Sequence, residues 1–136
     1  MKIVFRILIG LVLALAALMT LQIIASESGE VVVVGSRDAE GAMQETRLWV
    51  VEYEGASYLR SGSPMAGWYQ RMQANPDVEV TRDERTFRAQ AMPDVSLREP
   101  INALMREKYG WADQLIALMF GRDDAIPIRL ALTDQN

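Results

Sequence analysis

The chain has 136 residues, half of them apolar, with 14 basic and 18 acidic side chains and a formal net charge of −4. It contains no histidine and no cysteine, which excludes a disulfide framework, a His or Cys metal site, a His-dependent catalytic triad and a cysteine nucleophile. The length predicts one small domain with accessory segments.

Residues 1–26 are predicted to form a membrane anchor or a signal segment. Residues 7–25 carry no charge, and at ~1.5 Å per residue this run is long enough to cross ~30 Å of hydrocarbon. Lys2 and Arg6 are the only charges before Glu27, so an uncleaved single-pass helix would have its N-terminus in the cytoplasm and the following domain outside. A cleaved signal peptide is the main alternative, although Ile23-Ile24-Ala25 fits a cleavage site poorly. A buried helix is a third possibility.

Residues 27–30 read as a polar linker, and residues 31–136 as the folded domain. Without Lys2 and Arg6 the chain keeps 12 basic and 18 acidic residues, a net charge of −6. This acidic balance argues against nucleic-acid binding.

The domain opens with three predicted strands. The β-branched run 31–34 is too short for a helix and is expected to be a buried strand. Residues 47–53 form the next strand after a polar turn over 37–41. The tight turn Glu54-Gly55 then leads into a third strand over 57–60, which gives a hairpin.

A serine- and glycine-rich turn follows the third strand. Ser63 is a favourable N-cap and Pro64 a favourable first helical residue, so a short helix is expected to begin there and to end at Asn75-Pro76. The unpaired backbone N–H groups at such a start can hold an anion, usually a phosphate. The alternative is an ordinary turn and helix cap.

The remaining pattern is strand, strand, helix, helix, strand. Strands are expected over 77–81 and 86–92, joined by a charged turn. A helix opens at Ser96 or Glu99, which form a possible capping box, and ends at Gly110. A second helix covers 111–120, and a last strand covers 126–132. Six short strands with hairpin connections favour an antiparallel barrel, because closure removes the sheet edges.

Several segments resemble one known superfamily. They are Arg47-Leu48-Trp49-Val50-Val51, Tyr58-Leu59-Arg60-Ser61-Gly62, Trp68-Tyr69 and Ala74-Asn75-Pro76-Asp77-Val78-Glu79-Val80. Together they resemble the flavin-binding split β-barrel superfamily, the pyridoxamine-phosphate-oxidase-like proteins. The nearest branch is the deazaflavin-dependent nitroreductase-like family. The resemblance covers about residues 31–133.

This resemblance implies a mainly β (α+β) fold, a six-stranded antiparallel split barrel that is usually a homodimer. It also implies that FMN or the deazaflavin coenzyme F-420 lies in a groove on the barrel, commonly against the partner subunit. The deazaflavin branch often has a lysine in the phosphate turn, whereas the only lysines here are Lys2 and Lys108. The implied cofactor-binding residues are Arg60, Ser61, Gly62, Ser63 and Trp68, with Arg47 or Arg88 as additional cations.

The function expected from the sequence is that of a membrane-anchored oxidoreductase that transfers hydride to a small organic substrate. In such chemistry the cofactor carries the reaction, and the protein binds and orients it. No residue is assigned a catalytic role, and no metal is expected. The alternative is a non-catalytic split-barrel protein of the cell envelope that binds a ligand or a partner.

Overall fold

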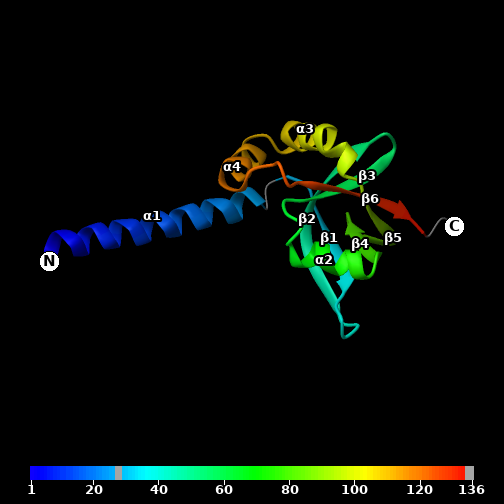
Figure 1. Ribbon diagram of the computed structural model, residues 1–136, viewed down its shortest axis with the longest axis horizontal. Coiled ribbons are helices and arrows are strands. Elements are labelled where there is room, and N and C mark those ends of the chain that lie inside the picture. The colour runs from blue at the N-terminus through cyan, green and yellow to red at the C-terminus, as the bar shows by residue number, and fades with distance from the viewer. Residues whose placement is uncertain (27–28, 134–136) are drawn as a thin grey trace.

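One long helix precedes a closed barrel of six antiparallel strands (Figure 1). A computed structural model describes residues 1–26 and 29–133. The strands pair in the order β1-β2-β3-β6-β5-β4, and β1 also pairs with β4, which closes the barrel. The predicted split barrel is therefore confirmed. The strands are β1 (Val31–Arg37), β2 (Met43–Tyr53), β3 (Ala56–Ser61), β4 (Asp77–Arg82), β5 (Arg85–Pro93) and β6 (Ile126–Leu132).

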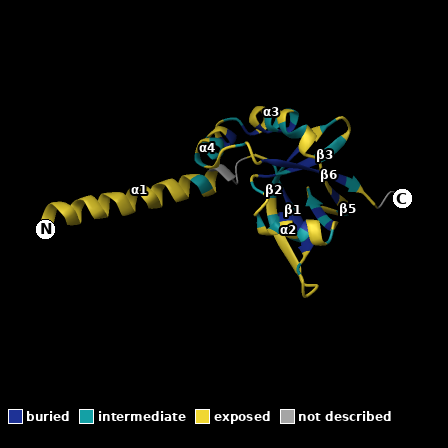
Figure 2. Cartoon of the chain, in the orientation of Figure 1, coloured by how far each residue is buried: buried dark blue, intermediate teal, exposed yellow. Residues whose placement is uncertain are grey.

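Helices cover parts of the barrel, and the first one projects away from it. They are α1 (Lys2–Ser26), α2 (Gly67–Ala74), the 3-10 turn η1 (Val95–Leu97), α3 (Arg98–Tyr109) and α4 (Trp111–Phe120). Figure 2 shows that α1 is exposed along almost its whole length. It is long and apolar enough to cross a membrane, and a helix that is apolar all round suits a lipid environment.

The main core fills the barrel, and a second core lies outside it. Alternating strand residues such as Val32, Val34 and Leu59 point inward and are almost completely buried, as the two-residue period of a strand requires. Ile101, Met105 and Tyr109 of α3 pack with Val51 and Tyr58 from β2 and β3. This packing fixes α3 against the outer face of the barrel.

Two of the predicted turns between strands are present as tight hairpin turns. Glu54 and Gly55, between β2 and β3, have φ values of 47° and 78°. Asp83 and Glu84, between β4 and β5, have φ values of 50° and 63°. Two successive residues with positive φ form the turn whose twist matches the twist of the flanking strands.

Several predicted boundaries and one predicted helix cap are wrong. Strand β1 continues to Arg37, three residues past its predicted end. Strand β2 begins at Met43, four residues early, because it pairs with β1 as far as Arg37. Helix α2 begins at Gly67 instead of Pro64; residues 64 and 65 form a turn, in which Ser63 Oγ accepts a hydrogen bond from the Met65 N–H at 3.0 Å. The capping box is also absent from the described contacts of Ser96, whose N–H instead donates to the Asp94 carboxylate at 3.0 Å.

Candidate functional site

A small cavity with a volume of about 170 Å³ lies between β2, β3, α3 and α4. Its walls combine basic and apolar side chains, an arrangement that suits an anionic group attached to an apolar body. The cavity is lined by three arginines (Arg47, Arg60 and Arg122), by Gly62, and by Leu48, Trp49, Met105 and Ile116.

The charge beside this cavity is unbalanced. Asp113 of α4 is 2% exposed and accepts hydrogen bonds from both Arg60 Nη2 and Arg122 Nη2, the latter at 2.7 Å. Arg60 also donates to Asn102 Oδ1 at 3.3 Å. The buried Arg60 and the partly buried Arg122 thus share one carboxylate, which leaves a net positive charge that favours an incoming anion.

The buried Arg60 guanidinium remains charged. Burial lowers the pKa of Arg60, and its hydrogen bond with Asp113 opposes that effect. Arginine starts from so high a pKa that it stays protonated in proteins. The positive charge at the cavity is therefore independent of pH over the physiological range.

One buried donor near the cavity has no acceptor in the part of the chain that the structure describes. Arg122 Nε is buried and has no hydrogen-bond partner among the described residues. Most buried polar atoms are paired, so such an atom calls for an explanation. At Gly62 an added Cβ would have no heavy atom within 4 Å, so there is open space beside the arginines. Positive charge and open space thus occur together at this cavity, and both favour a small anion.

The structure brings together only some of the residues predicted from the sequence. Arg47, Arg60 and Gly62 line the same cavity. Ser61 is fully buried, and its hydroxyl donates to the Ser63 carbonyl at 2.7 Å, so it is used within the turn. Because α2 begins only at Gly67, the predicted anion site at a helix start beginning with Ser63 is wrong in its geometry.

Trp68 and Arg88 lie elsewhere. Trp68 packs against the barrel core and meets the Tyr69 ring edge-on, with 6.4 Å between ring centroids. Arg88 is exposed on β5, opposite Glu79 of β4, and lines a different cavity that also contains Asp77. Asp77 and Glu79 balance the charges of Arg88 and of Arg37, which also lines that cavity, so the cavity is a poorer site for an anion.

Comparisons with known proteins rest on the fold. No protein-family model matches the chain, and neither does any curated protein. Similar solved structures include the heme storage protein HutZ from Vibrio cholerae, 17% identical, covering 82% of this chain and 87% of that chain with a TM-score of 0.60. An F-420 reductase is 13% identical, covering 81% and 91% of the two chains with a TM-score of 0.53.

A third similar structure is a protein from Listeria innocua provisionally assigned as a pyridoxamine 5′-phosphate oxidase. It is 15% identical, covering 82% of this chain and 90% of that chain, with a TM-score of 0.57. The chain shares the split-barrel fold of these solved structures. At these identities the likeness establishes the fold of this split barrel and leaves its ligand to be argued from the site.

Sequence reasoning missed two charged residues here: Arg122, which lines this split-barrel cavity, and Asp113, which pairs with it. Asp113 is the only charged residue in α4, and a lone acid in an apolar helix indicates a buried pair. That signal was available in the sequence, although the partner was not. Arg122 follows the helix in a polar turn and carries no sequence signal that distinguishes it from a solvated arginine.

Proposed function

We propose that the cavity binds the phosphate of a flavin-type cofactor, FMN or the deazaflavin coenzyme F-420, and that the protein is a membrane-anchored oxidoreductase. The supporting observation is the charge imbalance around Asp113 together with the unpartnered Arg122 Nε. Guanidinium groups bind phosphate oxygens with strong, directional hydrogen bonds. A flavin-type cofactor, when bound, supplies hydride transfer to a small organic substrate.

The size of the cavity supports a homodimer. Pockets that enclose a whole organic ligand usually have volumes of ~300–1000 Å³, whereas this cavity has a volume of about 170 Å³. One chain therefore has space for a phosphate and a small part of the cofactor. The rest would lie on the barrel surface, where a second chain would cover it.

In this proposal the side chains of the protein bind and orient the cofactor. Arg47 and Arg122 hold the phosphate, Asp113 keeps its two arginine partners in place, and Trp49 with Ile116 excludes water from the apolar wall. No side chain is assigned to proton transfer. The same geometry would serve a non-catalytic ligand-binding protein, so turnover must be measured apart from binding. Heme storage has less support, because the chain lacks histidine and cysteine, two common ligands of heme iron.

The proposed location is the membrane, through α1. The 23 residues Lys2–Ile24 form a span that is not buried against the barrel. Lys2 and Arg6 favour a cytoplasmic N-terminus. The barrel would then lie outside the cytoplasm, tethered to the bilayer surface.

The test is a titration of FMN and of oxidised F-420 into the full chain in detergent, followed by fluorescence. Arg47→Gln removes a charge from the cavity, and Gly62→Val fills space at a position where no positive φ and no close neighbour opposes a side chain. Loss of a charged hydrogen bond of ~1.5–3 kcal/mol predicts binding weakened ~10- to 100-fold in Arg47→Gln. We expect Gly62→Val to weaken binding as well.

Arg88→Gln is the matched control, because it removes the same charge from a strand remote from the cavity. Equal weakening by Arg88→Gln, or no binding by a folded wild-type chain, would contradict the phosphate site. If a cofactor binds, oxidation of its reduced form in the presence of a nitroaromatic acceptor separates an enzyme from a binding protein.

A further inference from the structure

The outer face of α4 is apolar and exposed. Trp111 is 55% exposed and Leu118 86% exposed. Phe120, the last residue of α4, is also exposed but lies on the other side of the helix. Leu118 is more exposed than any other large apolar side chain within residues 29–133. Soluble proteins seldom present such a cluster to water unless it meets a membrane or another protein.

The orientation of α4 is set by its one charged residue. Asp113 faces the barrel, where Arg60 and Arg122 hold it. Successive helical residues are ~100° apart, so Trp111 and Leu118 lie on one face, roughly opposite Asp113. Rolling the helix to bury its apolar face would break both ion pairs. The apolar face therefore stays outward.

Helix α4 lies beside the C-terminal end of α1. The two helices contact each other, and Figure 1 shows α4 at the side of the barrel from which α1 projects. The last turns of α1 also expose apolar side chains, including Ile23 at 63% and Ile24 at 55%. The exposed apolar surface of the candidate membrane span thus continues onto α4.

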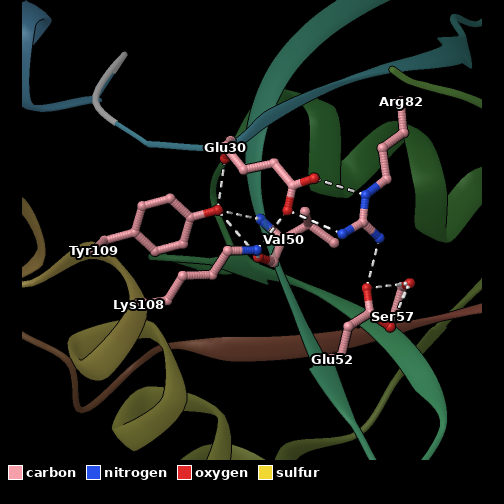
Figure 3. Close-up of polar contacts among 7 residues, drawn as sticks. All are labelled: Glu30, Val50, Glu52, Ser57, Arg82, Lys108 and Tyr109. Carbon is pink, nitrogen blue, oxygen red and sulfur yellow. Dashed lines mark hydrogen bonds and ion pairs between the residues drawn. The ribbon is translucent and has the colours of Figure 1, made fainter. Parts of the chain in front are cut away.

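The chain cannot move α4 far from the end of α1. Glu30 is fixed to the barrel: its carboxylate accepts hydrogen bonds from Arg82 at 2.8 and 2.9 Å and from Lys108 at 2.6 Å (Figure 3). Its carbonyl accepts one from the Tyr109 hydroxyl at 2.6 Å. Four residue steps separate Ser26, the end of α1, from Glu30, and at most ~3.6 Å per residue they span ~14 Å.

We propose that α4 is an interfacial helix, whose Trp111 and Leu118 lie in the headgroup region of the bilayer that α1 crosses. This inference rests on the proposed membrane anchoring and is independent of the cofactor. An apolar helix face lying in the plane of the membrane buries its side chains near the acyl boundary. Tryptophan is enriched at that depth, where its ring and N–H meet both environments. The bilayer is favoured as the occupant because the apolar surfaces of α1 and α4 are continuous.

The test uses single cysteines in the full chain, which has none of its own. Leu118→Cys is labelled with an environment-sensitive fluorophore after reconstitution into phosphatidylcholine vesicles. Quenching is then compared for lipids brominated near the headgroup and for aqueous iodide. We expect strong quenching by the shallow bromolipid and several-fold weaker quenching by iodide than for a fully exposed label.

Two further labels act as controls. Glu40→Cys places the probe at the exposed tip of the β1–β2 hairpin, which Figure 1 shows far from α4. It is expected to be quenched by iodide only. Leu13→Cys places the probe in the middle of α1 and is expected to be quenched by deeply brominated lipid.

Each contrary result has a defined meaning. If the label at 118 is as open to iodide as the label at 40, α4 is in water and the proposal is overturned. If it is shielded from iodide and from bromolipid alike, protein covers α4, which also overturns the proposal and favours contact with a second copy. If deeply brominated lipid does not quench the label at position 13, both the membrane anchoring and this proposal are wrong. If the label at 13 is quenched but the label at 118 is not, only this proposal is wrong.

Discussion

At the scale of single residues, the most consequential feature is a carboxylate shared by two arginines. Asp113 is almost fully buried, as is the Arg60 side chain, which is 5% exposed. Removing one member of a buried charge cluster is more costly than never having the cluster, because the remaining charges are left without compensation. The same excess of positive charge that strains this cluster gives the cavity its attraction for an anion.

Asp113→Asn should therefore destabilise the protein strongly. The substitution keeps the shape of the side chain and leaves the buried Arg60 and the partly buried Arg122 without a negative charge. We expect the free energy of unfolding to fall by ~3–5 kcal/mol, measured by urea denaturation of the full chain in detergent. Asp124→Asn, at an exposed turn position, is the matched control and should change stability little. Similar effects at the two positions would show that the pairing of Asp113 is unimportant.

A second residue-scale prediction compares two glycines with similar backbones. Gly29 has φ +76° and Gly55 has φ +78°, but only at Gly29 would a Cβ meet another residue, at 2.9 Å from Tyr109 Cδ1. Gly55→Ala should lower the free energy of unfolding by ~1–2 kcal/mol, because of the unfavourable φ alone. Gly29→Ala should lower it more, because the Tyr109 ring stacks on Trp49 with 4.2 Å between centroids and cannot easily move. Equal losses in thermal unfolding would contradict the contact.

At the scale of elements, one cluster joins β1, β2, β4 and α3 where the chain enters the barrel. Glu30 precedes β1, Arg82 ends β4, and Lys108 and Tyr109 end α3 (Figure 3). The Tyr109 hydroxyl accepts a hydrogen bond from the Val50 N–H at 3.0 Å, which docks α3 on β2. These contacts link elements that are far apart in the chain, so they form only when the barrel closes.

The Glu30 contacts predict a pH dependence of stability. The hydrogen bond from Arg82 is the main reason that the pKa of Glu30 is lowered in the folded protein. A lowered pKa means that the stabilisation is present above the ordinary glutamate pKa of ~4.3 and is lost as the pH falls through the lower folded value. Glu30→Gln should thus be less stable than wild type at neutral pH, with the difference shrinking below pH ~4. A constant difference in urea denaturation across this range would contradict the assignment.

At the scale of the whole molecule, a barrel with an acidic surface is tethered closely to an apolar helix. Excluding Lys2 and Arg6, the chain carries a net charge of −6. All the basic residues that precede the barrel lie in the first six residues. This asymmetry predicts that the barrel is translocated and the N-terminus is retained.

Reporter fusions test that orientation. A phosphatase that is active only outside the cytoplasm, fused after Asn136, should be active in cells. A reporter that fluoresces only in the cytoplasm, fused at the same position, should be dark. The opposite pair of results would reverse the orientation, and Lys2→Glu with Arg6→Glu should weaken the bias if the two charges set it.

Short-range patterns in the sequence were sufficient for most of the elements. The alternation of Val78 and Val80, the glycine in the Glu54-Gly55 turn and the helix stop at Asn75-Pro76 each depend on neighbours within a few positions. Closure of the barrel was predicted because an open sheet of six strands would leave its two edge strands without a partner on one side. The start of α2 was the main local error, because Ser63-Pro64 supports a turn as well as a helix start.

The site could not be located in the same way. Arg60 and Asp113 are 53 positions apart, and they meet only because α4 packs beside α3 and shares a cavity with β3. The same packing buries Asp113 and exposes Leu118, the reverse of what their polarity suggests. The two-residue alternation of a strand and the residue types of a turn depend only on neighbours within a few positions, so the sequence alone determines these elements. Which charges converge, and which apolar face stays outward, depends on barrel closure, and only the tertiary structure decides it.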